Sequence, residues 1–155
     1  MHELAHANGP TERCNWRQIN WTEVNRVVRN LRRRIFRATK EGNFKKVRSL
    51  QKLLLRNRAN ILQSVRRVTQ QNKGKKTPGV DRLVVLTDHA RGWMADTLLR
   101  YQPWRVKPVR RVYIPKANNK QRPLGIPTIQ DRCLQAMVKN ALEPEWEARF
   151  EPTSY

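Results

Sequence analysis

Apolar residues recur every three to four positions through the first half of the chain, which is the spacing of one face of an α-helix. One such stripe consists of Val24, Val27, Val28, Leu31, Ile35 and Ala38. It predicts a helix over residues 22–40 with Thr22 as its N-cap. A second stripe consists of Val47, Leu50, Leu54, Ile61, Val65 and Val68. It predicts one helix over residues 44–71, and the short link at Gly42 makes the two helices antiparallel neighbours.

Two further helices are expected in the second half of the chain. The first covers residues 88–100, and its inward face is made by Trp93, Met94, Leu98 and Leu99. The second covers residues 129–142, begins at the N-cap Thr128 and is interrupted at Pro144. Its apolar stripe consists of Leu134, Met137, Val138, Ala141 and Leu142.

Strand patterns lie between these two helices. Residues 110–115 alternate and are β-rich, which predicts a strand, and residues 117–120 have the composition of a turn. Residues 122–127 are expected to return as a second strand, whose prolines suggest an edge or a strand end. An extended stretch around Trp104 leads into the first strand. The expected fold class is therefore α+β: mostly helical, with basic helices at the N-terminus followed by a small antiparallel β-hairpin.

The charge balance narrows the choice of partners. The chain has 33 Lys+Arg against 12 Asp+Glu, a net charge of +21. Residues 1–76 hold 20 basic and 4 acidic residues, a net of +16, whereas residues 77–155 hold 13 and 8, a net of +5. Such an excess favours a polyanion as partner and predicts binding that weakens steeply with salt.

Basic residues repeat on the polar faces of the first two predicted helices and continue into the segments that follow. We predict that these side chains contact RNA or a template strand. They are Arg26, Arg29, Arg33, Arg37, Lys45, Arg48, Lys52, Arg56, Arg66, Arg67, Lys73, Lys75, Lys76, Arg110 and Arg111. The alternative is a set of solvated helix faces, although such faces usually mix both signs of charge and these helices carry almost no acid.

The lysine-rich segment at residues 72–81 ends in a Pro-Gly turn. It is either a linker between helical elements or a loop that closes over a nucleic-acid backbone, because glycines let main-chain N–H groups approach phosphates.

Other function classes find little support. No apolar run reaches the length of a membrane span, and residues 1–10 do not have the pattern of a secretory signal. Cys14 and Cys133 form no spaced metal motif, which indicates two reduced thiols and a cytoplasmic setting. The three histidines form no catalytic or ligand set, so we assign no catalytic and no metal-binding residue in this chain.

Two segments resemble one protein family. The first spans residues 64–81 and ends in Lys-Thr-Pro-Gly-Val-Asp; the second begins with Arg-Arg-Val-Tyr-Ile-Pro-Lys at residues 110–116 and continues through Arg-Pro-Leu-Gly-Ile-Pro-Thr at residues 122–128. Together with Leu-Glu-Pro at residues 142–144, they are similar to the N-terminal extension and first fingers blocks of bacterial group II intron-encoded reverse transcriptases (maturases). The resemblance covers residues 16–155.

The resemblance implies an RNA-directed DNA polymerase that also assists the splicing of its own intron. Residues 1–20, ahead of the first predicted helix, are expected to be a flexible lead-in. The resemblance implies an RNA-binding extension at residues 21–81 and part of a right-hand polymerase fingers subdomain at residues 82–155. The expected partners are group II intron RNA, and DNA target and dNTPs in the complete enzyme. The family's Mg²⁺-binding palm aspartates would lie beyond Tyr155, so the chain alone is expected to bind no cofactor and to be inactive as a polymerase. Its end shortly after a helix is typical of a cut through a larger domain.

The resemblance also assigns nucleotide binding to Lys116 and Arg122, which match the family residues that contact the incoming triphosphate. Two solvated hairpin charges are the alternative. Three alternatives for the whole chain also stay open: a stand-alone RNA- or DNA-binding protein derived from a polymerase fragment, a split-enzyme subunit, and a basic scaffold of the ribosomal-protein kind.

Overall fold

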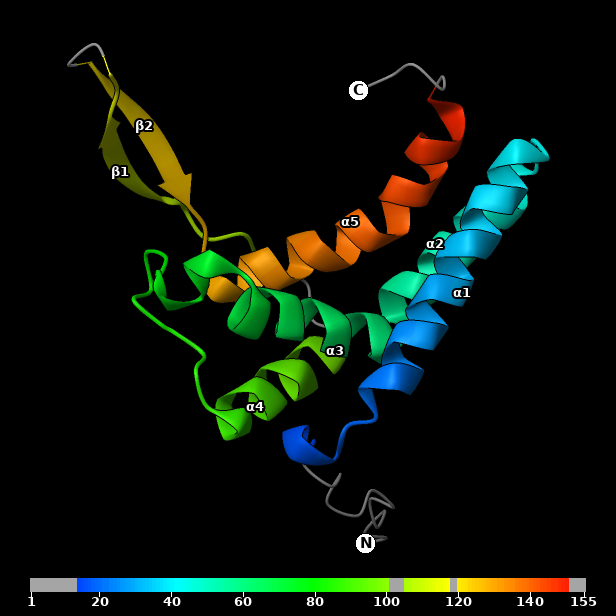
Figure 1. Ribbon diagram of the computed structural model, residues 1–155, viewed down its shortest axis with the longest axis horizontal. Coiled ribbons are helices and arrows are strands. Elements are labelled where there is room, and N and C mark those ends of the chain that lie inside the picture. The colour runs from blue at the N-terminus through cyan, green and yellow to red at the C-terminus, as the bar shows by residue number, and fades with distance from the viewer. Residues whose placement is uncertain (1–13, 101–104, 118–119, 151–155) are drawn as a thin grey trace, which may run out of the picture.

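The computed structural model describes residues 14–100, 105–117 and 120–150, which form a helical body with a projecting hairpin (Figure 1). The helices are α1 (Trp21–Lys40), α2 (Phe44–Arg56), α3 (Arg58–Arg66), α4 (Asp88–Leu99) and α5 (Ile129–Arg149). The strands are β1 (Arg110–Pro115) and β2 (Gln121–Ile126). The predicted class, mostly helical α+β with an antiparallel hairpin, is confirmed.

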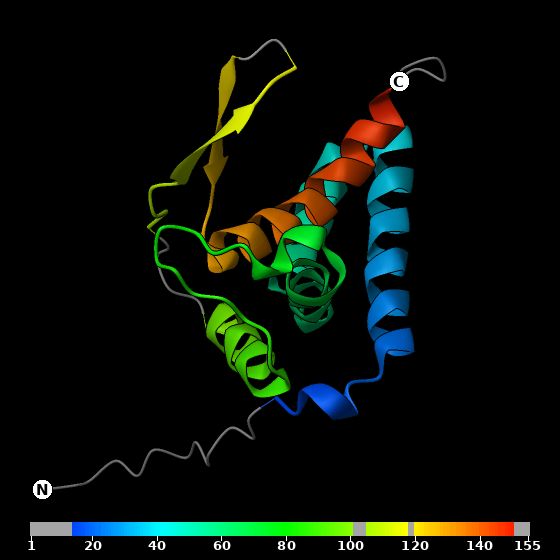
Figure 2. The same cartoon turned by 60° about the vertical axis from the view of Figure 1, so that its left-hand side comes forward.

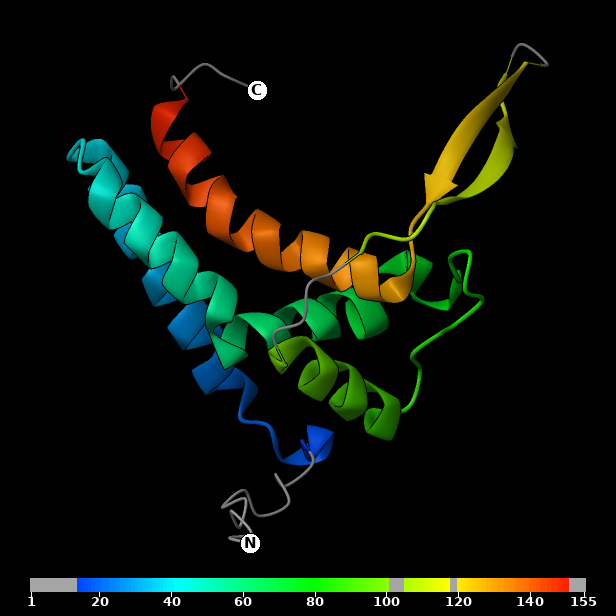
Figure 3. The same ribbon diagram turned by 180° about the vertical axis from the view of Figure 1, so that it is seen from behind.

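Helices α1 and α2 lie side by side and antiparallel, as predicted (Figures 1 and 3). Gly42 makes the reversal with a φ of 70°, a conformation that glycine adopts without steric cost. Asn43 then caps α2 by accepting a hydrogen bond from the Lys46 N–H at 3.1 Å. The cap predicted for α1 was wrong: Asn20, not Thr22, accepts the Glu23 N–H at 3.1 Å.

The single helix predicted over residues 44–71 is two helices. Asn57 has extended dihedrals (φ −77°, ψ 127°) and its side chain accepts the Ala59 N–H at 2.8 Å, so it ends α2 and caps α3. The apolar stripe continues across the break, which is why periodicity alone did not reveal it. After α3 the chain makes a π-helical turn, η2 (Arg67–Gln71), and a short 3₁₀ turn, η3 (Lys73–Lys76).

Helix α5 runs through Pro144, contrary to the predicted interruption. The proline is fully buried, and both of its neighbours are held from other helices: Arg32 of α1 binds Glu143 at 2.8 Å and Gln51 of α2 binds Glu145 at 2.7 Å. These contacts keep the chain helical, and α5 bends in the second half of its length (Figure 3).

Two of the predicted inward faces were partly wrong. In α4, Met94 is buried but Trp93 is 58% exposed and Leu99 38% exposed, because Gly92 faces the protein and its Cα packs under the Cys14 carbonyl. In α5, Met137 and Ala141 are buried, whereas Val138 and Leu142 lie on an exposed side.

Two apolar cores hold the body together. One lies between α1 and α2, around Ile35 and Leu54, and reaches α5 through Ala141. The other joins the segment at Trp16 to α3, α4 and the first half of α5. Residues from both halves of the sequence therefore share a core, and α3 lies at its centre beneath α5 (Figure 1).

The hairpin projects from the N-terminal end of α5 (Figure 2). Its strands are antiparallel, with Arg110 opposite Ile126 and Pro115 opposite Gln121, so the second strand begins one residue earlier than predicted. Residues 118–119 of the predicted turn, the stretch at Trp104, most of the lead-in and residues 151–155 lie outside the described residues. Among the helices that are described, none is both long and apolar enough to cross a bilayer.

Candidate nucleic-acid interface

The predicted basic residues of α1 and α2 lie on the surface. All eight of them, Arg26 to Arg56 in the predicted set, are exposed. Arg26 is the member with a carboxylate partner, since it binds Glu23 through two hydrogen bonds at 2.7 and 2.8 Å. That contact lowers the pKa of Glu23 below its ordinary value.

Four predicted residues that are far apart in the sequence converge on one cleft. Arg29 and Arg33 come from α1, Arg66 from the end of α3 and Arg67 from the start of η2. The cleft lies between α1, the α3–η2 segment and α5, and has a volume of about 510 Å³. We call it the arginine cleft. The basic residues of α2 do not line it.

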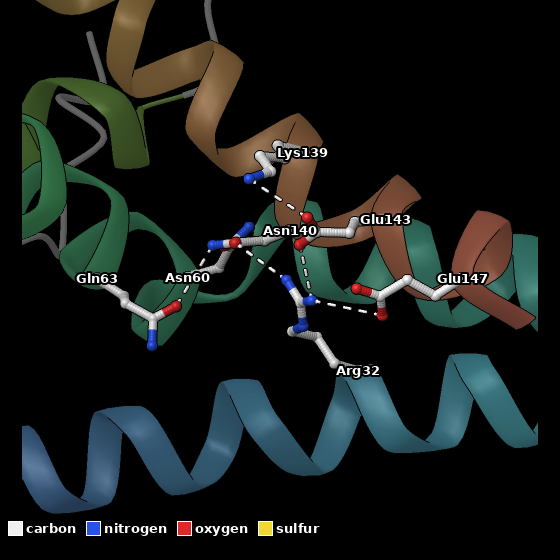
Figure 4. Close-up of polar contacts among 7 residues, drawn as sticks. All are labelled: Arg32, Asn60, Gln63, Lys139, Asn140, Glu143 and Glu147. Atoms are coloured by element: carbon white, nitrogen blue, oxygen red, sulfur yellow. Dashed lines mark hydrogen bonds and ion pairs between the residues drawn. The ribbon is translucent and has the colours of Figure 1, made fainter. Parts of the chain in front are cut away.

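Arg32, which the sequence patterns did not single out, forms one wall of the arginine cleft. Its guanidinium donates to Glu143 at 2.8 Å and to Asn140 Oδ1 at 3.3 Å, and lies 3.9 Å from Glu147 (Figure 4). Burial raises the pKa of Glu143, but hydrogen bonds from Arg32 and Lys139 outweigh that effect and place the pKa below its usual range. Arg32 therefore joins α1 to α5.

A chain of amides continues from Arg32, buried at Asn140 and Asn60 and reaching the surface through Gln63 (Figure 4). Asn140 donates to Asn60 Oδ1 at 2.8 Å and to Gln63 Oε1 at 3.3 Å. Gln63 in turn donates to Asn25 Oδ1 at 2.9 Å. The spacing of these amides along the sequence gave no signal, because they meet only when α1, α3 and α5 pack together.

Arg66 is ordered by an aromatic ring rather than by an acid. Its guanidinium carbon lies 4.3 Å from the centroid of the Trp21 ring, within the range of a cation–π contact. Trp21 itself packs edge-on against the buried Trp16. The positive charge of Arg66 is held in place without being neutralised.

The lysine-rich loop is fastened to the start of α5 by one arginine. Arg132 donates from Nη1 to the Gly74 carbonyl at 3.1 Å, from Nη2 to the Thr77 carbonyl, and from Nε to the Pro127 carbonyl at 3.0 Å. Burial is the main reason that the pKa of Arg132 lies below its usual value. An arginine still remains charged at neutral pH.

A close backbone approach fixes the other end of the loop. A Cβ on Gly79 would lie 2.6 Å from Thr128 Cα, which leaves room for glycine alone. Thr128 also caps α5, accepting the Asp131 N–H at 3.1 Å, as predicted. Within this segment Lys73 and Lys76 are exposed, whereas the Lys75 ammonium donates to the Gln70 carbonyl at 2.9 Å.

The hairpin separates its charges into two groups. Lys116 and Arg122 lie at the far end, where Arg122 pairs with Ile114 and the Lys116 N–H bonds to the Lys120 carbonyl at 2.7 Å; both side chains are exposed. Arg110 and Arg111 lie at the base, opposite Ile126 and Gly125. The expectation that Lys116 and Arg122 share one end of the ribbon is confirmed, and their role toward a nucleotide stays a prediction.

Among the residues that the structure describes, no three His, Cys, Asp or Glu side chains lie close enough together to bind a metal ion. Both cysteines are buried and free, and burial raises the pKa of Cys133 to about 12. The arrangement is suited to holding anions at several places on the surface.

Comparison with known proteins finds a family match that includes the basic helices α1 and α2. Residues 16–98 match the family described as the N-terminal domain of reverse transcriptase. Protein YkfC of Escherichia coli (strain K12) is 45% identical over 96 residues, which cover 57% of this chain and 24% of that protein.

Two relatives carry more informative names. Maturase-like protein 1 of Euglena gracilis is 30% identical over 136 residues, covering 87% of this chain and 30% of that protein. Group II intron-encoded protein LtrA of Lactococcus lactis subsp. cremoris is 38% identical over 91 residues, covering 54% of this chain and 14% of that protein. The chain thus spans less than a third of the length of these relatives.

Proposed function

The chain belongs to the family of N-terminal domains of reverse transcriptases, and on that premise we propose that it is the RNA-binding front part of a group II intron reverse transcriptase-maturase. The observation that carries this proposal is the dense positive charge on α1 and α2, most of which has no carboxylate partner in the described structure. In the described structure, Arg29, Arg33 and Arg37 of α1 have no carboxylate within ion-pair distance.

In this proposal the helical body grips intron RNA mainly through its phosphates and shape, and so assists splicing. Such binding needs cations that are free to replace condensed counterions. Lys45, Arg48 and Lys52 meet that requirement, because all three are exposed on one helix that is packed on its opposite side.

The loop and the hairpin would serve DNA synthesis during intron mobility. Lys73 and Lys76 would contact the template, and Lys116 and Arg122 the triphosphate of an incoming nucleotide, whose developing charge fixed cations stabilise. Replacing Lys116 or Arg122 by alanine in the longer protein should raise the KM for deoxynucleotides. An unchanged KM would remove both residues from this role.

The polymerase activity itself is assigned to the longer protein. Two-metal phosphoryl transfer requires a set of carboxylates that hold Mg²⁺, and the family match covers an N-terminal domain. We therefore expect no primer extension by the 155 residues alone, and extension by the purified chain would contradict this assignment.

Binding of the 155-residue chain to group II intron transcripts at several salt concentrations tests the proposal. The triple variant Lys45→Gln, Arg48→Gln and Lys52→Gln should bind more weakly, with a salt slope smaller by about 0.7–0.9 for each phosphate that the variant no longer neutralises. Ser49→Ala, an exposed neutral change on the same helix, is the matched control. Binding no tighter to intron transcripts than to an unrelated structured RNA would overturn the proposal.

A further inference from the structure

The arginine cleft is concave, whereas the other predicted basic residues of α1 and α2 lie on outward helix faces. Its volume of about 510 Å³ falls within the usual range for a small-molecule site. The regular backbone of an RNA helix can lie along a convex face, but filling this space requires a group that leaves the helix. Unpaired nucleotides in RNA bulges and loops do so, because their bases can turn outward.

The lining of the cleft favours an anionic ligand. Arg29, Arg32, Arg33, Arg66 and Arg67 are opposed by Glu147, a balance of five positive charges against one negative. Arg32 forms an ion pair with Glu143 of α5, and Arg66 makes a cation–π contact with the ring of Trp21. Arg29, Arg33 and Arg67 are exposed, and none has a carboxylate within ion-pair distance in the described parts of the chain. They are placed to hold a phosphate.

The same cleft offers groups that suit a base. Phe36 lines it with a ring that is 39% exposed, and a base could stack on the ring opposite or in place of the exposed Lys40, whose ammonium lies 5.8 Å from the ring centroid. Asn25 uses its carbonyl oxygen to accept from Gln63, which leaves the amide hydrogens of this exposed side chain available as donors. Gln71 adds a second exposed amide. Amides of this kind bond the edges of unpaired bases. Asn25 precedes Phe36 on α1 by about 16 Å along the helix axis, so its amide suits a flanking base and not the one at Phe36.

The π-helical turn η2 positions two residues that line the cleft, Arg67 and Gln71. The Asn72 N–H bonds to the Arg67 carbonyl at 2.9 Å, five residues back, so the turn holds one residue more than an α-helical turn. Val68 and Thr69 are buried on its inner side, while Arg67 and Gln71 both line the cleft. Such turns often occur at functional sites.

We propose that the arginine cleft receives a single unpaired nucleotide of the bound RNA, with its phosphate at Arg29, Arg33 and Arg67 and its base against Phe36. This inference rests on the proposed RNA-binding function and adds to it a preference for a particular RNA feature. Outward-facing cations would strengthen binding to any RNA, whereas the cleft would distinguish a bulged RNA from a fully paired one.

Short RNA hairpins with and without one unpaired nucleotide test the proposal, with all four bases used in turn at the bulge. The unmodified chain should bind at least one bulged hairpin about tenfold more tightly than the paired one, which is within the effect of one stacked base. Phe36→Ala and the double variant Arg29→Gln, Arg67→Gln should lose that preference. The double variant Arg37→Gln, Lys45→Gln lies outside the cleft. It should weaken the binding of both hairpins equally and keep the preference for the bulged one.

A fluorescent base analogue, 2-aminopurine, at the bulge provides a readout of stacking. Its emission should fall when the unmodified chain binds and fall much less with Phe36→Leu, a variant that keeps the apolar volume and the fold. Equal affinity of the unmodified chain for paired and all bulged hairpins would overturn the cleft proposal while leaving RNA binding intact. Failure to bind either RNA would overturn the proposed function itself.

Discussion

Arg132 makes a testable connection between packing and the lysine-rich loop. Changing Arg132 to alanine removes the donors to the Gly74, Thr77 and Pro127 carbonyls at once. The first two of these bonds hold the loop. A hydrogen bond to a charged group contributes about 1.5–3 kcal/mol, and water replaces part of it at these half-exposed carbonyls, so we expect the loop to open more easily by about 2–3 kcal/mol.

Hydrogen exchange of the loop amides measures this effect. The Lys75 and Thr77 N–H groups bond within the loop, to the Asn72 and Gly74 carbonyls, and are protected only while it is closed. A loss of about 2–3 kcal/mol corresponds to exchange about 30- to 150-fold faster. Arg132→Lys keeps the charge but loses the planar guanidinium, so its exchange rates should lie between those of the unmodified chain and those of Arg132→Ala. Gln135→Ala, exposed on the same helix, should change nothing.

Unchanged exchange at Lys75 and Thr77 in Arg132→Ala would refute the view that this side chain anchors the loop. A general loss of protection throughout α5 would instead mean that the arginine stabilises the whole body. The proposed template contact adds a second readout, since a loosened loop should weaken template binding while the RNA affinity of α2 is kept.

Three further changes probe the interior. Gly79→Ala should destabilise the chain by about 1–3 kcal/mol, because the new Cβ meets the Thr128 backbone, whereas Gly74→Ala has its nearest neighbour at 3.9 Å and should be neutral in thermal melts. Asn60→Leu removes the bonds to the Leu54 and Met137 carbonyls and the acceptor of the Asn140 amide, and should cost about 1–3 kcal/mol in denaturant titrations; unchanged stability would contradict the buried network. Burial raises the pKa of the Cys133 thiol to about 12. The unfolded thiol ionises at lower pH than the folded one, so the stability that this thiol contributes is complete below about pH 9 and is lost as the pH rises toward 12. Cys133→Ala should remove this loss of stability between pH 9 and 12.

The elements that the sequence predicted well are those that local patterns determine. The apolar stripe of α1 and the glycine turn at Gly42 act within one helix or one link, and both were correct. The hairpin was correct for the same reason, because alternation and turn residues lie within a few positions of each other.

The misplaced elements depend on contacts across the fold. Pro144 stays helical because α1 and α2 hold its two neighbours, and Trp93 faces outward because Gly92 takes the inner position. The break at Asn57 leaves the apolar stripe intact, so the cap was the one available signal. The arginine cleft could be predicted only in part: its basic residues were identified, but Arg32 and the amides of Asn60 and Asn140 come together through packing.

Crosslinking of the chain to a bound group II intron transcript, with the attached residues identified by mass spectrometry, tests the central claim most directly. We predict attachment sites on α1, α2, η2 and the loop at Lys73 and Lys76, with protection of the arginine cleft on binding. Attachment confined to α4 and the outer side of α5, or no attachment above that of an unrelated RNA, would contradict the claim.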